Sequence, residues 1–290
     1  MHVTVNNSRL WFDVDGQQLV PDGSRMRERP IVVLLHGGPG GYDHSYFKPW
    51  FGALTGVAQV VYLDLRDHGR SERHDPATWT FEACADDVRA FCDALGIVRP
   101  IVLGHSIGGV VALLYAARHP GHAGALVLQS TMARFDLDRL TEGFRRVAGD
   151  RVAHLARQDF SGNDISDDEW AAVFAAFGPR LPSPDVLARR LRNPDVGAIG
   201  EERMRALDAV ADLRLIDRPT LVCVGDRDPG TPVEASREIV EALPAGLGRL
   251  AVLEGVGHFP WLDAPDRYWP LIEEFVATAG RRGEGHSRGL

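Results

Sequence analysis

The chain has 290 residues, of which 44% are hydrophobic and 25% are charged, the usual balance of a soluble globular protein. This length suits one large α/β domain with an inserted subdomain. A formal net charge of −8 provides no basic surface for nucleic acid or anionic lipid, so neither is an expected partner.

The predicted elements alternate along the chain. The first 20 residues predict two or three short antiparallel strands, separated by Gly and Asn. Almost wholly apolar segments, each typical of a buried parallel strand, follow at 31–35, 60–63, 100–103, 125–128, 220–224 and 250–253. Amphipathic or apolar helical patterns lie at 80–95, 107–117, 232–243 and 263–277. The alternation predicts an α/β fold with a doubly wound, mostly parallel sheet.

One long segment, 131–215, has helical patterns and no convincing strand. Ser166 and Glu169 have the spacing of a capping box at the start of one of its helices, and prolines separate the later ones. We predict a helical cap at 131–215, inserted after the fourth parallel strand into a core formed by 1–130 and 216–280.

The remaining features concern the cysteines and the chain ends. Cys84, Cys92 and Cys223 fit neither a disulfide framework nor a zinc spacing, so we expect three core residues in a reducing compartment. No signal peptide is evident, and no apolar stretch approaches the ~20 residues that span a bilayer, which predicts a cytoplasmic protein without a membrane partner. Residues 281–290 lack apolar periodicity and predict a disordered tail.

A serine between glycines follows the strand expected at 100–103 and begins a buried helix. The sequence from Gly104 to Gly108, GHSIG, matches the G-x-S-x-G nucleophile elbow in its required strand–helix context. Glycines are needed because a side chain on either flank would collide with neighbouring backbone. Ser106 would lie at a helix N-terminus, where free N–H groups and the dipole favour developing negative charge, so we predict that it is the nucleophile.

The glycine-dense turn HGGPGG follows the strand expected at 31–35. Such a turn lets the backbone approach a ligand, as an oxyanion hole requires. One N–H group should come from this turn and one from the residue after the nucleophile. We predict the oxyanion donors to be the N–H groups of Gly38 and Ile107.

The base and the acid are predicted from their order along the chain, which in this fold is serine, acid, histidine. After the last strand only His258 and His286 remain, and His286 lies in the polar tail. His258 follows a strand and a glycine-containing turn, and we predict that it is the base. The loop GDRDPGTP offers Asp226 and Asp228; Asp228 lies farther into the loop and is the favoured acid, with Asp226 as the alternative.

Residues beside these groups are candidate substrate contacts. His36 and Gly37 belong to the glycine-rich turn, and His105 precedes the nucleophile. Trp261, three residues past His258, either lines the pocket or anchors the last helix. No histidine spacing forms a convincing metal site, and the predicted chemistry needs neither a metal nor an organic cofactor.

Five motifs together resemble the α/β-hydrolase superfamily. HGGPGG, DLRDHGRS, GHSIGG, GDRDPGTP and GVGHFP occur in its order and spacing, and HGGPG resembles its proline iminopeptidase-like branch. The resemblance covers about 31–130 and 212–272, which is the core and not the cap. It implies the α/β-hydrolase fold and a triad of Ser106, Asp228 and His258.

The substrate is less defined by the resemblance. Proline iminopeptidases usually carry a GGSWGG elbow, where this chain has His105 and Ile107, and Asp67 replaces a glycine usual in DxRGxGxS. They bind the substrate's free amino group with cap glutamates, for which the candidates here are Glu142, Glu169, Glu201 and Glu202. We expect hydrolysis of a small ester or amide, including N-terminal prolyl substrates, through an acyl-serine. An esterase, lactonase or C–C bond hydrolase on the same triad is the alternative, and a small-molecule receptor is the alternative of another class.

Overall fold

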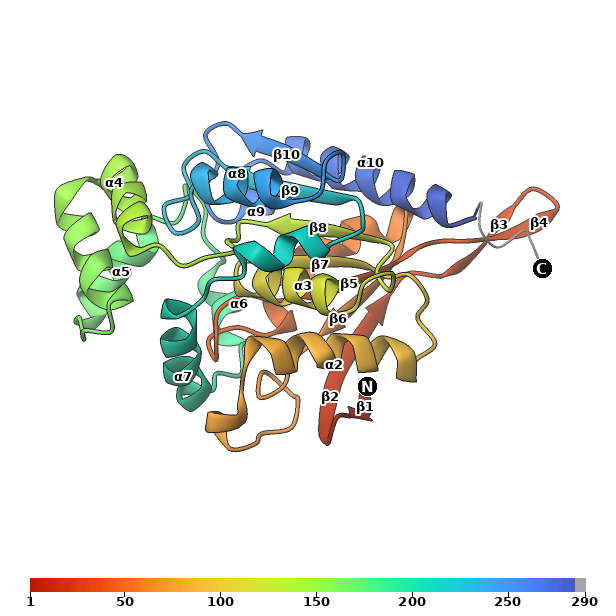
Figure 1. Ribbon diagram of the computed structural model, residues 1–290, viewed down its shortest axis with the longest axis horizontal. Helices are drawn as coiled ribbons and strands as arrows, with labels where there is room; N and C mark the ends of the chain where they lie inside the picture. Colours follow the sequence, from red (N-terminus) through yellow and green to blue (C-terminus); the bar gives the residue numbers. More distant parts are fainter. Residues whose placement is uncertain (285–290) are drawn as a thin grey trace.

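A computed structural model describes residues 1–284 (Figure 1). The strands are β1 (His2–Val5), β2 (Ser8–Asp15), β3 (Leu19–Asp22), β4 (Arg25–Glu28), β5 (Ile31–Leu35), β6 (Gln59–Leu63), β7 (Ile101–His105), β8 (Ala125–Gln129), β9 (Thr220–Gly225) and β10 (Gly248–Leu253). The α-helices are α1 (Lys48–Phe51), α2 (Phe81–Ala94), α3 (Ile107–Arg118), α4 (Leu137–Phe160), α5 (Asp167–Ala175), α6 (Pro184–Ala188), α7 (Pro194–Arg205), α8 (Val233–Ala242), α9 (Pro260–Asp263) and α10 (Pro265–Glu284). The short 3₁₀ helices are η1 (His44–Tyr46), η2 (Gly52–Gly56), η3 (Pro76–Thr78) and η4 (Val210–Leu215).

Eight strands form one sheet in the order β1-β2-β6-β5-β7-β8-β9-β10. The strands from β5 to β10 pair in parallel, because helices and longer connections carry the chain back between them. The strands β1 and β2 join antiparallel at the β6 edge. The predicted mostly parallel sheet is therefore confirmed.

The hairpin formed by β3 and β4 is separate from this sheet and projects from the body of the molecule (Figure 1, right). The sequence predicted a strand near β3 but not β4. All four side chains of β4 are exposed and three of them are charged, so the alternating apolar pattern that identifies a half-buried strand is missing.

Alternate side chains of the parallel strands enter two apolar clusters, one on each face of the sheet. Val33 and Leu35 of β5 pack with α2, α3 and α8, whereas Val32 and Leu34 pack with α1, α9 and α10. Figure 1 shows α2 and α10 on opposite sides of the sheet. Burial on both faces explains why these strands are continuous apolar runs. The three cysteines are buried and unpaired, as predicted for core residues.

Helices α4, α5, α6 and α7 lie between β8 and β9, within the segment predicted to be helical. Figure 1 shows α4 and α5 (green) at one end of the molecule, clear of the sheet. The capping box at the start of α5 is confirmed, because Ser166 and Glu169 each accept from the other's backbone N–H group. Helix α4 bends at Gly149, which has a φ of 83°.

Helix α10 continues to Glu284, four residues into the segment 281–290 that the sequence assigned to a tail. The rest of that segment, 285–290, lies outside the described residues. Among the helices of residues 1–284, none has both the length and the apolar character needed to cross a bilayer.

Candidate active site

Ser106 occupies a strained turn between the end of β7 and the start of α3. Its φ of 55° and ψ of −122° lie in a region that side-chain-bearing residues rarely adopt, at a cost of about 1–3 kcal/mol. The flanking glycines make the turn possible. A Cβ on Gly104 would lie 2.2 Å from the Gly108 oxygen, and one on Gly108 would lie 2.1 Å from the Leu35 oxygen. The sequence therefore places the Ser106 side chain on a turn that only glycine neighbours permit.

The glycine-rich turn after β5 lies directly against this serine. A Cβ on Gly37 would come within 3.0 Å of the Ser106 Cβ. Gly38 has a φ of +58°, and a Cβ there would meet the Tyr42 ring at 2.5 Å. Both glycines are therefore required, one by close approach to the serine and the other by backbone conformation and space.

The backbone N–H groups around Ser106 divide into used and unused donors. In the turn, the N–H groups of Gly37, Gly40 and Gly41 donate to protein acceptors at 3.0, 2.8 and 3.3 Å. Within residues 1–284, no hydrogen bond is made by the N–H groups of Gly38 or Ile107. The Ile107 N–H belongs to the first turn of α3, where N–H groups have no partner inside the helix. These two are the predicted oxyanion donors, and both are available to a ligand.

His258 and Asp228 form a buried hydrogen-bonded pair in which His258 Nδ1 lies 2.8 Å from Asp228 Oδ2. The carboxylate is held by its own loop: Oδ1 accepts from the Gly230 and Thr231 N–H groups, both at 3.0 Å, and Oδ2 accepts from Thr231 Oγ1 at 2.7 Å. Since the carboxylate only accepts, Nδ1 carries a proton, and Nε2 is the nitrogen that can take the serine proton in the neutral ring. The alternative acid, Asp226, is exposed and accepts from a backbone N–H elsewhere.

The elbow and the His258 loop are joined by a bond between a side chain and the backbone, not by the catalytic atoms. In the described part of the chain the Ser106 hydroxyl forms no hydrogen bond with His258. The carbonyl oxygen of His258 is instead 2.9 Å from His105 Nε2, one residue before the nucleophile. Catalytic hydrogen bonds are often long before substrate binds and tighten in the complex.

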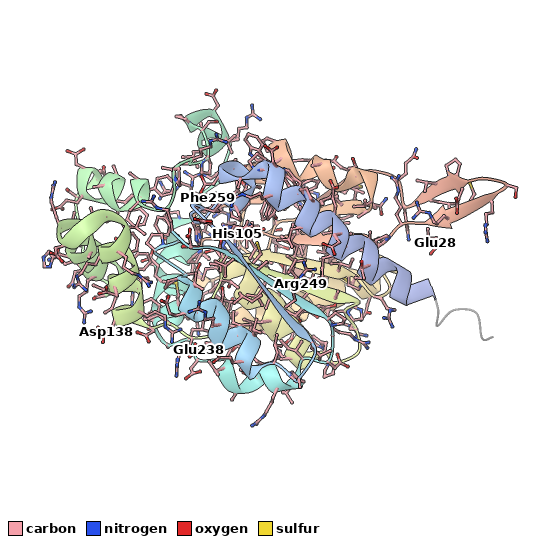
Figure 2. The ribbon with its side chains drawn as sticks, turned by 90° about the horizontal axis from the view of Figure 1, so that it is seen from above. Glu28, His105, Asp138, Glu238, Arg249 and Phe259 are labelled. Atoms are coloured by element: carbon pink, nitrogen blue, oxygen red, sulfur yellow. The ribbon has the colours of Figure 1, made fainter. Side chains whose placement is uncertain are left out.

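Three predicted substrate contacts are enclosed by protein. His36 is fully buried, with Nδ1 3.1 Å from the Gly37 oxygen and Nε2 accepting from the Leu65 N–H at 3.2 Å. His105 is also buried, and Figure 2 shows it inside the molecule beside Phe259, with ring centroids 5.6 Å apart. Burial lowers the pKa of both histidines, so both rings are neutral.

Trp261 is the third enclosed residue. Its ring is buried and packs 6.4 Å from that of Tyr268 in α10 and 5.3 Å from that of Phe51. Of the two roles left open by the sequence, the contacts fit the anchor for the last helix. Gly37 lies against the nucleophile, since a Cβ there would come within 3.0 Å of the Ser106 Cβ.

The segments after α5 and before α7 approach the site, which the sequence did not predict. The Phe177 carbonyl accepts from the His258 N–H at 2.6 Å, and the two rings are 5.1 Å apart. Asn193 donates from its N–H to the Gly40 oxygen at 2.8 Å and from Nδ2 to the Asp67 oxygen at 2.9 Å. No sequence pattern identifies these residues, because each acts through a contact distant in the chain.

Two of the four candidate glutamates already have partners within the protein. Glu142 is bonded to Arg145, and Glu169 is occupied by its capping box. Burial, with the charge of Glu201 as a smaller cause, raises the pKa of Asp159 in α4 to about 6. Asp159 was not predicted, since a single acidic residue near a helix end has no distinctive pattern.

One buried group of possible metal ligands, Asp43, His44 and Asp64, has ligand atoms within 4.8 Å of one another. Its oxygens are already occupied. Asp64 Oδ1 accepts from the His44 N–H and lies 2.8 Å from His44 Nδ1, while Oδ2 accepts from the Arg70 N–H at 2.9 Å. Asp43 Oδ2 accepts from the Leu191 N–H at 2.8 Å. The group is therefore an internal hydrogen-bond network rather than a site preformed for a cation.

The sequence profile of the alpha/beta hydrolase fold family matches residues 30–265. This chain belongs to that family. The hydrolase is 27% identical over 263 residues to the proline iminopeptidase PfmaB of Pestalotiopsis fici, covering 86% of this chain and 92% of the relative. It is 30% identical over 254 residues to the pimeloyl-[acyl-carrier protein] methyl ester esterase of Neisseria meningitidis, covering 84% and 76%.

Among solved structures, the hydrolase resembles the crystal structure of proline iminopeptidase from Mycobacterium smegmatis. The TM-score is 0.74 at 20% identity, with 98% of this chain and 99% of the other covered. At that identity the likeness establishes the α/β-hydrolase fold. The superfamily membership predicted from the five motifs is therefore confirmed.

Proposed function

We propose that this chain is a serine hydrolase that cleaves a small ester or amide through an acyl-serine intermediate. Ser106 is the nucleophile, His258 the base and Asp228 the group that orients the base. The observation that carries the proposal is the strained turn at Ser106, which lies against a glycine turn and beside two unused N–H groups. Strained turns of this kind concentrate at functional sites.

The proposed reaction has two halves. His258 Nε2 takes the Ser106 proton as Oγ attacks the substrate carbonyl carbon, and the Gly38 and Ile107 N–H groups hold the resulting oxyanion. The imidazolium then protonates the leaving alcohol or amine, whose bond to carbon breaks. In the second half, water gives a proton to His258 and attacks the acyl carbon. The bond from that carbon to Ser106 Oγ then breaks, Oγ takes the proton from His258, and the acid leaves. Asp228 stabilises the imidazolium in each half.

We further propose that helices α4, α5, α6 and α7 act as a cap that selects the substrate. Support comes from the two contacts by which this insertion reaches the site, at His258 through Phe177 and at the glycine turn through Asn193. A cap glutamate such as Glu201 would favour a substrate with a free amino group. The buried, unpaired cysteines are compatible with the cytoplasm, which we propose as the location.

A substrate panel tests the proposal. Prolyl and other aminoacyl arylamides are compared with short and long p-nitrophenyl esters and with lactones. We expect turnover of at least one class, and a loss of several orders of magnitude, up to ~10⁶, in Ser106→Ala. The matched control is Ser24→Ala in the exposed hairpin, which should be fully active. A strong preference for N-terminal proline would assign the iminopeptidase activity, whereas indifference to the amino group would favour an esterase or lactonase.

Full activity of Ser106→Ala would contradict the proposal. The alternative of another class, a small-molecule receptor, predicts a folded wild-type protein that turns over no substrate and does not react with a fluorophosphonate. Because that probe reports the reactivity of the serine without a cognate substrate, it separates the receptor from a hydrolase whose substrate is missing from the panel.

A further inference from the structure

We infer that Tyr46 and His105 act as a positioning pair that holds the three catalytic segments in register. The inference rests on the proposed function and assigns roles to two residues that the triad and the oxyanion hole do not use. The three segments are the glycine turn at Gly37, the elbow at Ser106 and the loop that carries His258.

One chain of hydrogen bonds joins these segments. The Gly37 N–H donates to Tyr46 Oη at 3.0 Å, Tyr46 Oη is 2.8 Å from His105 Nδ1, and His105 Nε2 is 2.9 Å from the His258 carbonyl oxygen. The direction of each hydrogen bond follows from the two end groups, the Gly37 N–H and the His258 carbonyl oxygen. A carbonyl oxygen only accepts, so His105 Nε2 carries the proton and Nδ1 accepts from the Tyr46 hydroxyl. The tyrosine oxygen then accepts from Gly37.

The chain is enclosed by aromatic side chains. Tyr46 is 1% exposed and His105 is 2% exposed. The Tyr46 ring stacks on Phe47 at 4.3 Å, and the His105 ring lies 4.9 Å from Trp261 and 4.7 Å from His258. Because both side chains are almost fully buried, a donor or acceptor that lost its partner here would be left unpaired, at a cost of about 1–3 kcal/mol. The pair is therefore held in one arrangement.

Charge supports the same arrangement. Burial, together with the neighbouring His258, lowers the pKa of His105 well below its usual value. A protonated His105 would carry hydrogen on Nδ1 and lose its bond from Tyr46. A neutral His105 keeps that bond, and it does not oppose the positive charge that His258 acquires during the proposed reaction.

Each of the three segments joined by these hydrogen bonds contains or adjoins a reacting group. Gly37 precedes the Gly38 N–H, His105 precedes Ser106, and the His258 carbonyl belongs to the base itself. A displacement of about 1 Å at such groups can cost ~10² in rate, although the pair touches no substrate. The elbow usual in proline iminopeptidases has glycine in place of His105, so the pair is a feature of this chain and is not implied by that resemblance.

The test uses Tyr46→Phe, His105→Phe and the double variant in the full-length protein. The readouts are the rate of inactivation by a fluorophosphonate, kcat and KM on p-nitrophenyl acetate, and Tm. We expect each single variant to lose ~10² in inactivation rate and kcat, with KM within about threefold of wild type. The double variant should be no worse than the more damaged single variant, because both break the same chain.

Tyr115→Phe is the matched control. Tyr115 is also buried and its hydroxyl is also bonded to a histidine Nδ1, that of His122, but this pair lies near the far end of α3. A merely structural tyrosine–histidine bond should lower Tm and leave both rates unchanged, as we expect for Tyr115→Phe.

Rates of Tyr46→Phe and His105→Phe within threefold of wild type would overturn the positioning role, as would losses that add in the double variant. If Tyr46→Phe fails to fold, His105→Phe decides alone, because its ring fills a similar volume but makes neither the bond from Tyr46 nor the bond to the His258 carbonyl. The proposed function fails separately, if wild type is unlabelled or Ser106→Ala is still labelled.

Discussion

Replacement of Asp228 by asparagine is expected to reverse the tautomer of His258. Asp228 Oδ1 accepts from two backbone N–H groups, those of Gly230 and Thr231. An asparagine must place its oxygen there, because its NH₂ group would otherwise face both donors. The NH₂ group then takes the position of Oδ2, 2.8 Å from His258 Nδ1. Nδ1 must accept, the proton moves to Nε2, and the base loses the lone pair that receives the serine proton.

The size of the effect follows from that loss. A wrong tautomer with intact geometry lowers kcat by ~10⁴ in the serine protease triad, and about 1.4 kcal/mol per factor of ten makes this about 5.5 kcal/mol of transition-state stabilisation. We expect a similar loss in Asp228→Asn, measured as kcat on p-nitrophenyl acetate and as the rate of fluorophosphonate inactivation, with normal circular dichroism. The matched control is Asp226→Asn, two residues away and exposed, which should stay within about threefold of wild type.

An Asp228→Asn enzyme that kept more than a tenth of the wild-type rate would refute the tautomer reversal. An equal loss in Asp226→Asn would also refute it, since Asp226 would then be the acid. The double variant Asp228→Asn/Thr231→Val checks that the backbone N–H groups of Gly230 and Thr231, and not the Thr231 hydroxyl, fix the asparagine. Removal of the hydroxyl should therefore not restore activity.

Three other predictions address stability and cofactors. Gly108→Ala should lower the free energy of unfolding in urea by more than about 3 kcal/mol, because its Cβ would lie 2.1 Å from the Leu35 oxygen. Gly56 has open space around it, so Gly56→Ala should change that free energy by less than about 0.5 kcal/mol. Equal effects of the two substitutions would contradict the packing of the elbow. The pKa of Asp159 is about 6 in the folded state and 3.8 in the unfolded state, so the folded state binds the proton more tightly. The free energy of unfolding therefore falls as pH rises from about 4 to 6, and the loss stays constant above pH 6. Asp159→Asn should therefore stabilise the protein by about 1 kcal/mol at pH 7.5, after allowance for solvent screening, with the gain vanishing toward pH 4; a gain independent of pH would disprove the cause. Dialysis against EDTA should leave esterase activity unchanged, and a loss restored by a divalent ion would show that a metal takes part.

The sheet could be predicted from the sequence because its strands are buried on both faces and bounded by helical patterns. The elbow could be predicted because the close approach of backbone at this turn requires glycine at positions 104 and 108, and the sequence shows those glycines directly. Hairpin β3–β4 escaped prediction because β4 is exposed and polar. His36, His105 and Trp261 were assigned to substrate binding from their nearness in sequence, with a helix anchor as the alternative for Trp261. All three are buried, and their contact with a substrate stays a prediction. Nearness along the chain does not say which way a side chain points.

The residues that contact the site from distant parts of the sequence could not be predicted from local sequence patterns. Tyr46 lies 59 residues from His105 in the chain, and Phe177 lies 81 residues from His258, so no periodicity or motif connects them. Asp67 shows a partial signal. It occupies a position usual for glycine, and its φ of 64° is the left-handed conformation that favours glycine. Its carboxylate accepts from the His74 N–H at 2.6 Å, which helps to hold a conformation that aspartate adopts more readily than most residues.

The central claim is that His258 makes Ser106 a nucleophile. Mass spectrometry of the protein after reaction with a fluorophosphonate tests it most directly. The account predicts one adduct per chain, located on Ser106, absent from Ser106→Ala and formed at least ~10³-fold more slowly in His258→Gln. An adduct on another residue, or an unchanged rate without the imidazole, would contradict it.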